Sequence, residues 1–237
     1  MTTYISIVTW NRRDILARVL DSLEATTPEP HVVLVTDNGS TDGTVELLMD
    51  RAEQGKLRAT LMPENVGSAR ARNAHWAQCI GHPAVKLDDK VEFLCPGWLT
   101  ALETLSAQTH ALLSPAYDPT VSHLETLAPC LPWIACPGDG GVGGPYLYVP
   151  AEVSTQLGVW DELPGVVYGW EDVLYVQRAR LLGWNYGWSM RSPAQYLAQA
   201  SEAARQESAE KHPIYVERLR QYREAERDLN IPMGVQG

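Results

Sequence analysis

The stretch TYISIVTWNRRDILARVLDSLEATTPEPHVVLVT, residues 3–36, decides the fold class. Two short runs of apolar and β-branched residues, 3–9 and 31–36, are typical of buried strands. The segment between them carries apolar residues at helical spacing: Ile15, Leu16, Val19, Leu20 and Leu23. We expect Asn11 to cap this helix, with Asp14 three residues later. A strand, a helix and a second strand of this kind form a βαβ unit of a parallel sheet.

The same alternation continues beyond residue 36. The patterns predict further strands at 57–62, 84–87 and 146–149, and helices at 44–53, 66–80, 97–107, 151–157, 171–183 and 201–228. The Pro- and Gly-rich segment 117–145 is typical of an irregular loop, and the mixed charge of 201–228 favours a solvated amphipathic helix. The sequence therefore predicts an α/β three-layer sandwich with a central, mostly parallel sheet.

Composition limits the function classes. The chain has 237 residues, of which 45% are hydrophobic and 20% charged, a balance typical of one globular domain. Its formal net charge of -10 disfavours nonspecific binding to nucleic acids or anionic membranes. The N-terminal apolar run is too short for a signal or spanning helix, so we expect no membrane span and a cytoplasmic protein.

Two patterns that could suggest other chemistry do not fit their structural context. The cysteines show no CxxC pair and are expected to be reduced, mostly buried thiols: Cys79, Cys95, Cys130 and Cys136. Gly138, Gly140 and Gly143 satisfy G-x-G-x-x-G, but they lie between a Pro-rich loop and a strand, whereas a dinucleotide fingerprint leaves a strand and opens a helix.

Polar residues follow three of the predicted strands. Thr9 and Asn11 follow the first, Asp37 in TDNGSTDGT follows the second, and Asp88 and Asp89 in KLDDK follow the strand at 84–87. Ligands bind at the carboxyl ends of strands in an open parallel sheet, so these residues are candidates for one site. Asp37 also fits an ordinary turn residue.

The pair Asp88 and Asp89 has two interpretations at this stage. It can form ion pairs with Lys86 or Lys90, which flank it. Alternatively, it can hold Mg²⁺ or Mn²⁺ together with a diphosphate, since such ions use one or two carboxylates and complete their shell with phosphate oxygens.

Two helices add candidates to this site. Arg70 and Arg72 are two residues apart, so only one of them can face the strand ends. Glu171 and Asp172 open a helix, where acids are favoured by the helix dipole, but they diverge by about 100° and at most one reaches a substrate. Trp170 fits either a ring that stacks on a ligand or a core residue.

The ordered set of motifs resembles the family 2 glycosyltransferases with the GT-A (Rossmann-like) fold. The matching stretches are ISIVTWNR, VTDNGSTDGT, NVGSARARN, KLDDKVEF with the GWL that follows, LGVWDE, and YGWEDVLYVQRARLLGW, and together they span roughly residues 4–188. The resemblance implies a single GT-A domain over 1–237. It divides into a nucleotide-binding half (1–95), an acceptor-binding half (96–190) and a C-terminal helical tail (191–237).

Carried over position by position, the resemblance implies roles for individual residues. Asp172 is implied as the catalytic base, with Glu171 orienting the site or binding the acceptor. The acceptor side would be lined by Trp170, Asp161 and Glu162. The nucleotide and its diphosphate would be contacted by eight residues: Thr9, Asn11, Arg12, Asp37, Asn65, Arg72, Asp88 and Lys90.

The sequence departs from the family pattern at the diphosphate motif. The family usually reads L-D-x-D, whereas Lys90 occupies the second aspartate position here and Asp89 the variable one. We favour a retained Mn²⁺ or Mg²⁺ held by Asp88 and Asp89, and the alternative is that the lysine ammonium replaces part of the ion's charge. His212 is a distant candidate for the histidine that sometimes completes the family's metal shell.

The resemblance implies an inverting glycosyltransferase that moves a sugar from a nucleoside diphosphate to an acceptor hydroxyl. UDP is the family's commonest carrier, and the acceptor lies beyond the sequence. A nucleotide-sugar-binding module that has lost catalysis remains an alternative, although the ED pair argues against it. A nucleotidyltransferase would require a glycine-rich basic loop after the first strand, and the sequence there is Thr9-Trp10-Asn11-Arg12.

Overall fold

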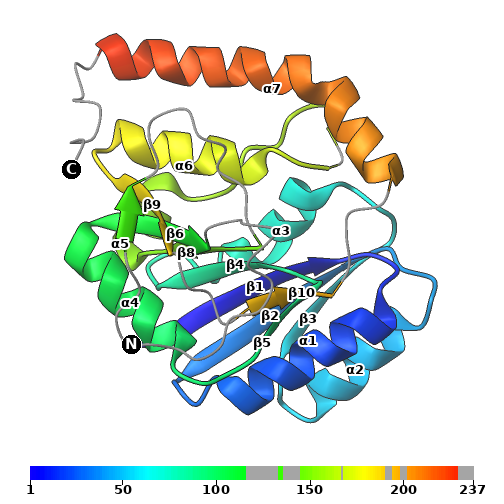
Figure 1. The fold of residues 1–237 in the computed structure, drawn as a ribbon. Helices are drawn as coiled ribbons and strands as arrows, with labels where there is room; N and C mark the ends of the chain where they lie inside the picture. The colour runs from blue at the N-terminus through cyan, green and yellow to red at the C-terminus, as the bar shows by residue number, and fades with distance from the viewer. Residues whose placement is uncertain (116–132, 136–144, 167, 190–193, 198–201, 229–237) are drawn as a thin grey trace.

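The computed structural model describes residues 1–115, 133–135, 145–166, 168–189, 194–197 and 202–228. Within these ranges, eight strands form the central sheet: β1 (Thr3–Thr9), β2 (His31–Asn38), β3 (Arg58–Met62), β4 (Ala84–Asp88), β6 (Ala111–Pro115), β7 (Trp133–Ala135), β8 (Tyr146–Val149) and β9 (Asn185–Ser189). The helices are α1 (Arg13–Thr26), α2 (Thr44–Glu53), α3 (Ser68–Trp76), α4 (Trp98–Thr109), α5 (Ala151–Leu157), α6 (Glu171–Leu181) and α7 (Glu202–Asp228). The predicted α/β class is confirmed (Figure 1).

The strand order of the sheet is β3-β2-β1-β4-β8-β6-β9-β7. The first four strands are parallel, and β8 runs antiparallel between β4 and β6. In this register Thr9 pairs with Asp37, and Val8 pairs with Asp88. The carboxyl ends of β1, β2 and β4 therefore meet at one edge, with β1 in the middle.

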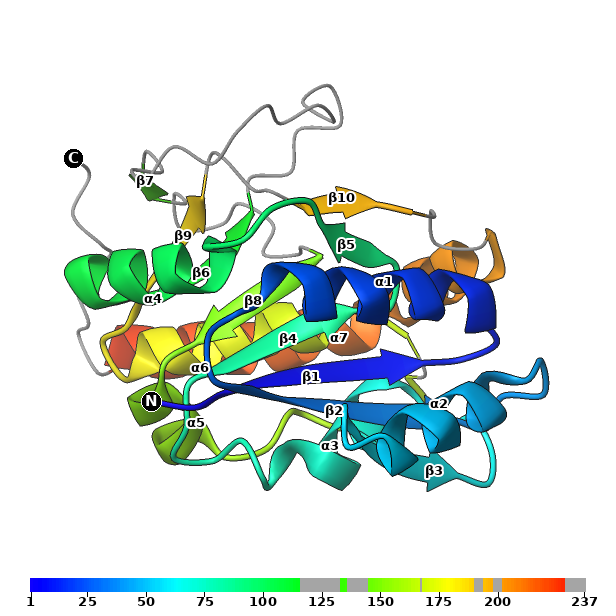
Figure 2. The ribbon, with the colours of Figure 1, turned by 90° about the horizontal axis from the view of Figure 1, so that it is seen from below.

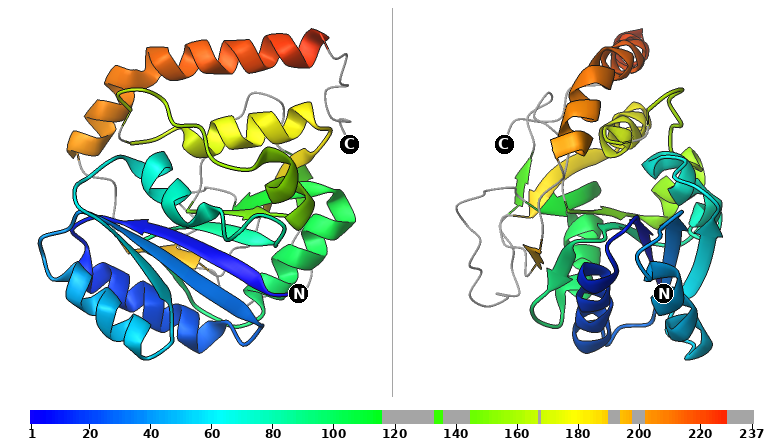
Figure 3. Two further views of the ribbon diagram at one scale, coloured as in Figure 1. Left: turned by 180° about the vertical axis from the view of Figure 1, so that it is seen from behind. Right: turned by 90° about the vertical axis from the view of Figure 1, so that its right-hand side faces the viewer.

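Helices cover both faces of the sheet and make three layers (Figure 3). One core joins Ile5 and Ile7 of β1 to apolar residues of α1, α2 and α4. The other joins the opposite face to α3, α5 and α6, with Trp76 and Trp160 among its largest buried side chains. Because β1 is covered on both sides, it reads as an almost continuous apolar run. The polar Ser6 lies buried in the middle of this run, on the α3 side.

A short second sheet lies beside α1 (Figure 2). It pairs β5 (Val91–Phe93) with β10 (Ala194–Tyr196) in antiparallel fashion. Since β5 starts two residues after Asp89, the turn at Asp89 and Lys90 is held between two strands. This arrangement fixes the chain where the KLDDK motif leaves the central sheet.

The predicted C-terminal helix is present and packs along α6 (Figure 1). Tyr215 and Leu219 of α7 are buried against Leu174 of α6, and the ring of Tyr215 stacks on Trp170 at 4.4 Å between centroids. Thus one face of α7 belongs to a small apolar cluster, while the remaining faces carry the mixed charge seen in the sequence.

Some local predictions are wrong. Asn11 does not cap α1: the N-cap is Arg12, and Asn11 has a positive φ of 51° and accepts a hydrogen bond from the Thr41 amide at 2.7 Å. Its amide joins two loops instead. The predicted helix 66–80 is shorter, as α3, and the short strands β5, β6, β9 and β10 were not predicted.

Residues 133–135 form β7 within the segment expected to be an irregular loop, most of which lies outside the described residues. Cys130 and Cys136 also lie outside them, whereas Cys79 and Cys95 are free thiols, Cys79 being buried. None of the helices in the described ranges is long and apolar enough to cross a membrane.

Candidate functional site

The end of β2 forms the first wall of the site. Asp37 is buried, and its Oδ2 accepts hydrogen bonds from the amides of Gly39 at 3.1 Å and Ser40 at 3.0 Å. Gly39 has a φ of +77°, and a Cβ there would lie 2.6 Å from backbone atoms of Glu64. The turn therefore needs glycine. Among the described residues, Asp37 Oδ1 and Thr9 Oγ1 are buried without a hydrogen-bond partner, so both can accept one from a ligand.

The end of β4 is a compact set of ion pairs. Lys86 Nζ lies 2.7 Å from Asp88 Oδ1, and Lys90 Nζ lies 3.5 Å from Asp88 Oδ2. Arg12, at the start of α1, donates to Asp89 Oδ1 at 2.9 Å. Three cations thus face two carboxylates at this corner of the sheet.

Lys86 also connects this corner to α6. Its ammonium lies 3.7 Å from Asp172 Oδ2, while Asp172 Oδ1 accepts a hydrogen bond from the Val173 amide at 2.9 Å. The side chain of Lys86 is 5% exposed and that of Asp172 is 14% exposed, so water screens this contact only weakly. One lysine therefore lies between the predicted diphosphate residue and the predicted base.

The carboxylates of this cluster differ in pKa. Burial raises the pKa of Asp172 to about 6, and the nearby charges of Glu171 and Asp88 add to this rise while Lys86 opposes it. For Asp88, burial acts in the same direction, but Lys86 and Lys90 hold its pKa below the ordinary value. Burial raises the pKa of Asp89 against the opposing effects of Arg12 and Lys90. Asp172 is therefore suited to accept a proton near neutral pH, and Asp88 is suited to stay ionised.

Arg72 rather than Arg70 faces the sheet, as the sequence predicts for one of the two. Arg72 is 2% exposed and donates from Nη1 to the carbonyl oxygen of Ser6 at 2.8 Å and to its Oγ at 2.9 Å. Ser6 Oγ is hydrogen-bonded to His75 Nε2, and Thr36 Oγ1 to His75 Nδ1, both at 2.6 Å. Burial and the charge of Arg72 lower the pKa of His75 to about 3, so the imidazole is neutral.

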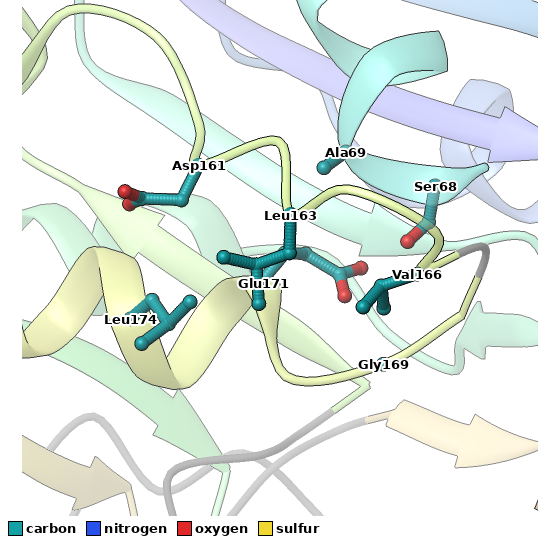
Figure 4. A pocket seen from close by; sticks show the side chains of 8 residues that line it. All are labelled: Ser68, Ala69, Asp161, Leu163, Val166, Gly169, Glu171 and Leu174. Atoms are coloured by element: carbon teal, nitrogen blue, oxygen red, sulfur yellow. The ribbon is translucent and has the colours of Figure 1, made fainter. Parts of the chain in front are cut away.

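Glu171 points into a small pocket between α3, α6 and the segment before α6 (Figure 4). Its Oε2 is buried and has no hydrogen-bond partner among the described residues. The other side chains and backbone around this space come from Ser68, Ala69, Asp161, Leu163, Val166, Gly169 and Leu174. An orphaned carboxylate oxygen in a pocket can accept a hydrogen bond from a hydroxyl of a bound molecule.

Of the residues predicted for the acceptor side, Asp161 lines this pocket, and both Asp161 and Glu162 are engaged in contacts within the protein. Asp161 pairs with Arg178 at 3.1 Å and accepts from the Tyr222 hydroxyl at 2.5 Å. Glu162 accepts from Asn73 Nδ2 at 2.8 Å. Their acceptor role stays a prediction.

Trp170, the N-cap of α6, has a positive φ of 73° and packs on α7, where its ring lies 5.2 Å from that of His212. A positive φ is uncommon for a bulky residue and marks a constrained backbone at the start of the ED helix. Asn65, predicted to contact nucleotide, accepts hydrogen bonds from Asn38 Nδ2 at 2.9 Å and from the Gly67 amide at 3.1 Å. It thereby holds the loop that precedes α3.

Sequence reasoning did not assign site roles to Lys86, Ser6 and His75. Each sits inside a strand or helix, where a polar residue gives no motif signal. The sequence did contain one signal, since Ser6 and Lys86 are polar residues in the middle of otherwise apolar strands. Burying a polar group costs free energy unless it forms a hydrogen bond or an ion pair, so such residues are expected to have partners.

The predicted metal ligands do not fit a divalent cation in this arrangement. Within the part of the chain that the structure describes, no group of three or more His, Cys, Asp or Glu side chains could hold a metal ion, so a metal would depend on Asp88, Asp89 and the phosphate oxygens of a ligand. Both oxygens of Asp88 face ammonium groups, and Asp89 faces a guanidinium. A metal at Asp88 would have to displace these cations.

Comparison with known sequences finds a family match in the N-terminal part of the chain. Residues 4–102 match the family described as Glycosyl transferase family 2. A Drosophila melanogaster protein called "Putative inactive polypeptide N-acetylgalactosaminyltransferase 12" is 32% identical over 116 residues, which cover 44% of this chain and 20% of that protein. The chain therefore spans about a fifth of the length of this relative.

Solved structures show the same fold. The mannosyltransferase PcManGT from Pyrobaculum calidifontis, in complex with GDP-Man and Mn²⁺, has a TM-score of 0.67 at 20% identity, with 93% of this chain and 64% of that chain covered. TarS residues 1–349 from S. aureus, in complex with UDP, has a TM-score of 0.63 at 16% identity, with 92% of this chain and 65% of that chain covered. GalNAc-T7 with UDP, GalNAc and Mn²⁺ has a TM-score of 0.63 at 16% identity, with 84% of this chain and 44% of that chain covered. The predicted resemblance and the GT-A fold are confirmed.

Proposed function

We propose that this chain, whose residues 4–102 match glycosyl transferase family 2, is an inverting glycosyltransferase that uses a nucleoside-diphosphate sugar. One observation carries the proposal. Lys86 lies 2.7 Å from Asp88 and 3.7 Å from Asp172, so a single buried cation joins the strand end where ligands bind to a carboxylate that can accept a proton.

In this reaction the acceptor hydroxyl attacks the anomeric carbon of the donor sugar. A new carbon–oxygen bond forms as the bond between that carbon and the diphosphate breaks, and its electron pair leaves with the diphosphate. Asp172 takes the proton from the hydroxyl. Because attack and departure occur on opposite sides of the carbon, the anomeric configuration inverts.

The orphaned oxygens at the sheet edge support a nucleotide on the β1–β2 side. Asp37 Oδ1 and Thr9 Oγ1 can accept hydrogen bonds from a base or ribose, and Asn11, Arg12, Asn65 and Arg72 lie on the loops and the helix around them. We propose UDP as the carrier. We also propose the division into residues 1–95 that bind the nucleotide, 96–190 that bind the acceptor, and a tail over 191–237.

The pocket beside α6 supports an acceptor side. Glu171 Oε2 is buried there without a partner among the described residues, and it would accept a hydrogen bond from the acceptor or from the transferred sugar. Asp161 lines the same pocket. Mn²⁺ appears in the names of two similar structures, whereas in this chain Asp88 faces ammonium groups and Asp89 faces a guanidinium group.

A nucleotide-sugar-binding module without catalysis is the second candidate. It is favoured by the ion pairs that occupy the predicted metal ligands, and by a relative whose name calls it putatively inactive. Such a module would bind UDP and leave the sugar bond intact.

A donor panel tests both functions. The protein would be incubated with UDP-glucose, UDP-GlcNAc, UDP-GalNAc and GDP-mannose, each with Mn²⁺ or EDTA, and release of nucleotide followed over hours. We expect slow hydrolysis of one donor, and NMR should show that the released sugar first appears with the opposite anomeric configuration. Tight UDP binding with no release from any donor favours the binding module, and retention of configuration refutes inversion.

A further inference from the structure

We infer that Lys86 and Lys90 take the place of a divalent cation at the diphosphate, so that this chain binds its donor without a metal. The inference rests on the proposed function and specifies which groups neutralise the negative charge of the donor's diphosphate. Its basis is the position of two ammonium groups on the carboxylate that would otherwise be the metal ligand.

Both oxygens of Asp88 are directed at lysines. Lys86 Nζ lies 2.7 Å from Oδ1, and Lys90 Nζ lies 3.5 Å from Oδ2. Both lysine side chains are almost fully buried, with exposed fractions of 5% and 8%, so they are held in place rather than free to swing in solvent. A built-in pair of cations thus occupies the space on either side of this carboxylate.

The cations of this corner already occupy the carboxylate oxygens. Arg12 pairs with Asp89, Lys90 and Lys86 face Asp88, and Lys86 also faces Asp172. A divalent cation would have to displace these groups from Asp88, whereas a diphosphate oxygen can accept hydrogen bonds from ammonium groups that are already in place.

The chemistry of the ammonium group suits this role. It has three N–H donors, so one lysine can bind a carboxylate and a phosphate oxygen at the same time. Lys90 lies in the turn after β4, at the edge where the strand ends meet, and Lys86 lies one step deeper between Asp88 and Asp172. We assign Lys90 to direct contact with the diphosphate and Lys86 to holding Asp88 and Asp172 in position.

Calorimetric titration of UDP and GDP into the purified chain tests this assignment. Each titration would be run in excess EDTA and again in millimolar Mn²⁺, after removal of bound metal. We expect one nucleotide to bind with a Kd that differs by less than about threefold between the two conditions, a difference of under 1 kcal/mol.

Variants distinguish a specific role of Lys90 in nucleotide binding from the effect of removing any positive charge. Lys90→Gln should weaken nucleotide binding by about 10- to 100-fold, the range for a lost charged hydrogen bond. Lys90→Arg should retain most of it. Lys56→Gln is the matched control, since Lys56 pairs with Glu24 on the exposed surface, and it should bind like the parent.

A reversal adds a second readout. Lys90→Asp removes a cation and places a third carboxylate beside Asp88 and Asp89, so nucleotide binding by this variant should require Mn²⁺. Circular dichroism would confirm that each variant folds.

Each outcome decides the matter. Binding that is lost in EDTA and restored by Mn²⁺ in the parent chain overturns the lysine assignment but leaves the proposed function standing. Metal-independent binding that Lys90→Gln leaves unchanged also overturns the assignment. Absence of UDP and GDP binding under every condition, with no release from any donor sugar, overturns the proposed function and the inference with it.

Discussion

Replacing Asp172 by asparagine should lower activity and raise stability at the same time. Asp172→Asn removes the proposed base, and general-base assistance typically contributes about 10²- to 10⁴-fold to turnover. The stability gain follows from burial. The pKa of Asp172 rises from 3.8 to about 6, so its ionised form in the folded protein costs about 3 kcal/mol at pH 7, at about 1.4 kcal/mol for each pH unit.

The sign of this effect depends on pH. Below about pH 4 the carboxyl group is protonated in both the folded and the unfolded chain, so the variant and the parent should be equally stable. As the pH rises from 4 to 6, the unfolded chain releases the proton first, and the free energy of unfolding of the parent falls relative to that of the variant. The difference is complete above about pH 6.

Urea unfolding of both proteins between pH 4 and pH 8 measures the difference, and release of nucleotide from the active donor measures turnover. Asp50→Asn is the matched control, because Asp50 is exposed on α2 and such surface changes typically alter stability by less than about 0.5 kcal/mol. A variant that is no more stable than the parent at pH 7 would refute the burial argument. Near-normal turnover would remove Asp172 from the role of base.

Three further predictions follow from contacts around the site. Gly39→Ala should lower the melting temperature and weaken UDP binding, since its Cβ would lie 2.6 Å from the backbone of Glu64. An unchanged UDP affinity would show that this turn does not contribute to nucleotide binding. Tyr222→Phe should cost about 1.5–3 kcal/mol in urea unfolding, because Asp161 loses a charged hydrogen bond, while UDP affinity stays the same. His75→Gln should reduce the loss of stability in acid. Because the pKa of His75 is lowered to about 3, the free energy of unfolding of the parent falls as the pH drops from 6.5 to 3. An equal fall in the variant would contradict this prediction.

The sequence predicted the parts of the fold that depend on local periodicity. β1, α1 and β2 were visible because a doubly covered strand is apolar throughout and a one-sided helix is apolar every three or four residues. The short strands β5 and β10 were not visible, because three residues carry no period and their pairing joins positions about 100 residues apart. Such pairing depends on tertiary packing rather than on local preference.

The site was predictable where it lies at the ends of elements. Asp37, Asp88 and Asp172 follow a strand or open a helix, and the topology of a parallel sheet brings strand ends together. The error at Asn11 has a physical reason: an asparagine before a helix fits both a cap and a residue of positive φ, and its bond to Thr41, thirty residues away, decided between them. Local sequence contains no information about that partner.

Lys86 explains how two carboxylates in contact with one cation acquire opposite properties. Its ammonium is 2.7 Å from Asp88 but 3.7 Å from Asp172, and Asp88 receives a second charge from Lys90. Coulomb attraction falls with distance, so the closer carboxylate keeps its charge while burial dominates at the more distant one. The pKa of Asp88 is consequently lowered and that of Asp172 raised to about 6. A site that must hold a charged group in place and move a proton beside it requires that difference, and the two lysines together with the burial of Asp172 provide it.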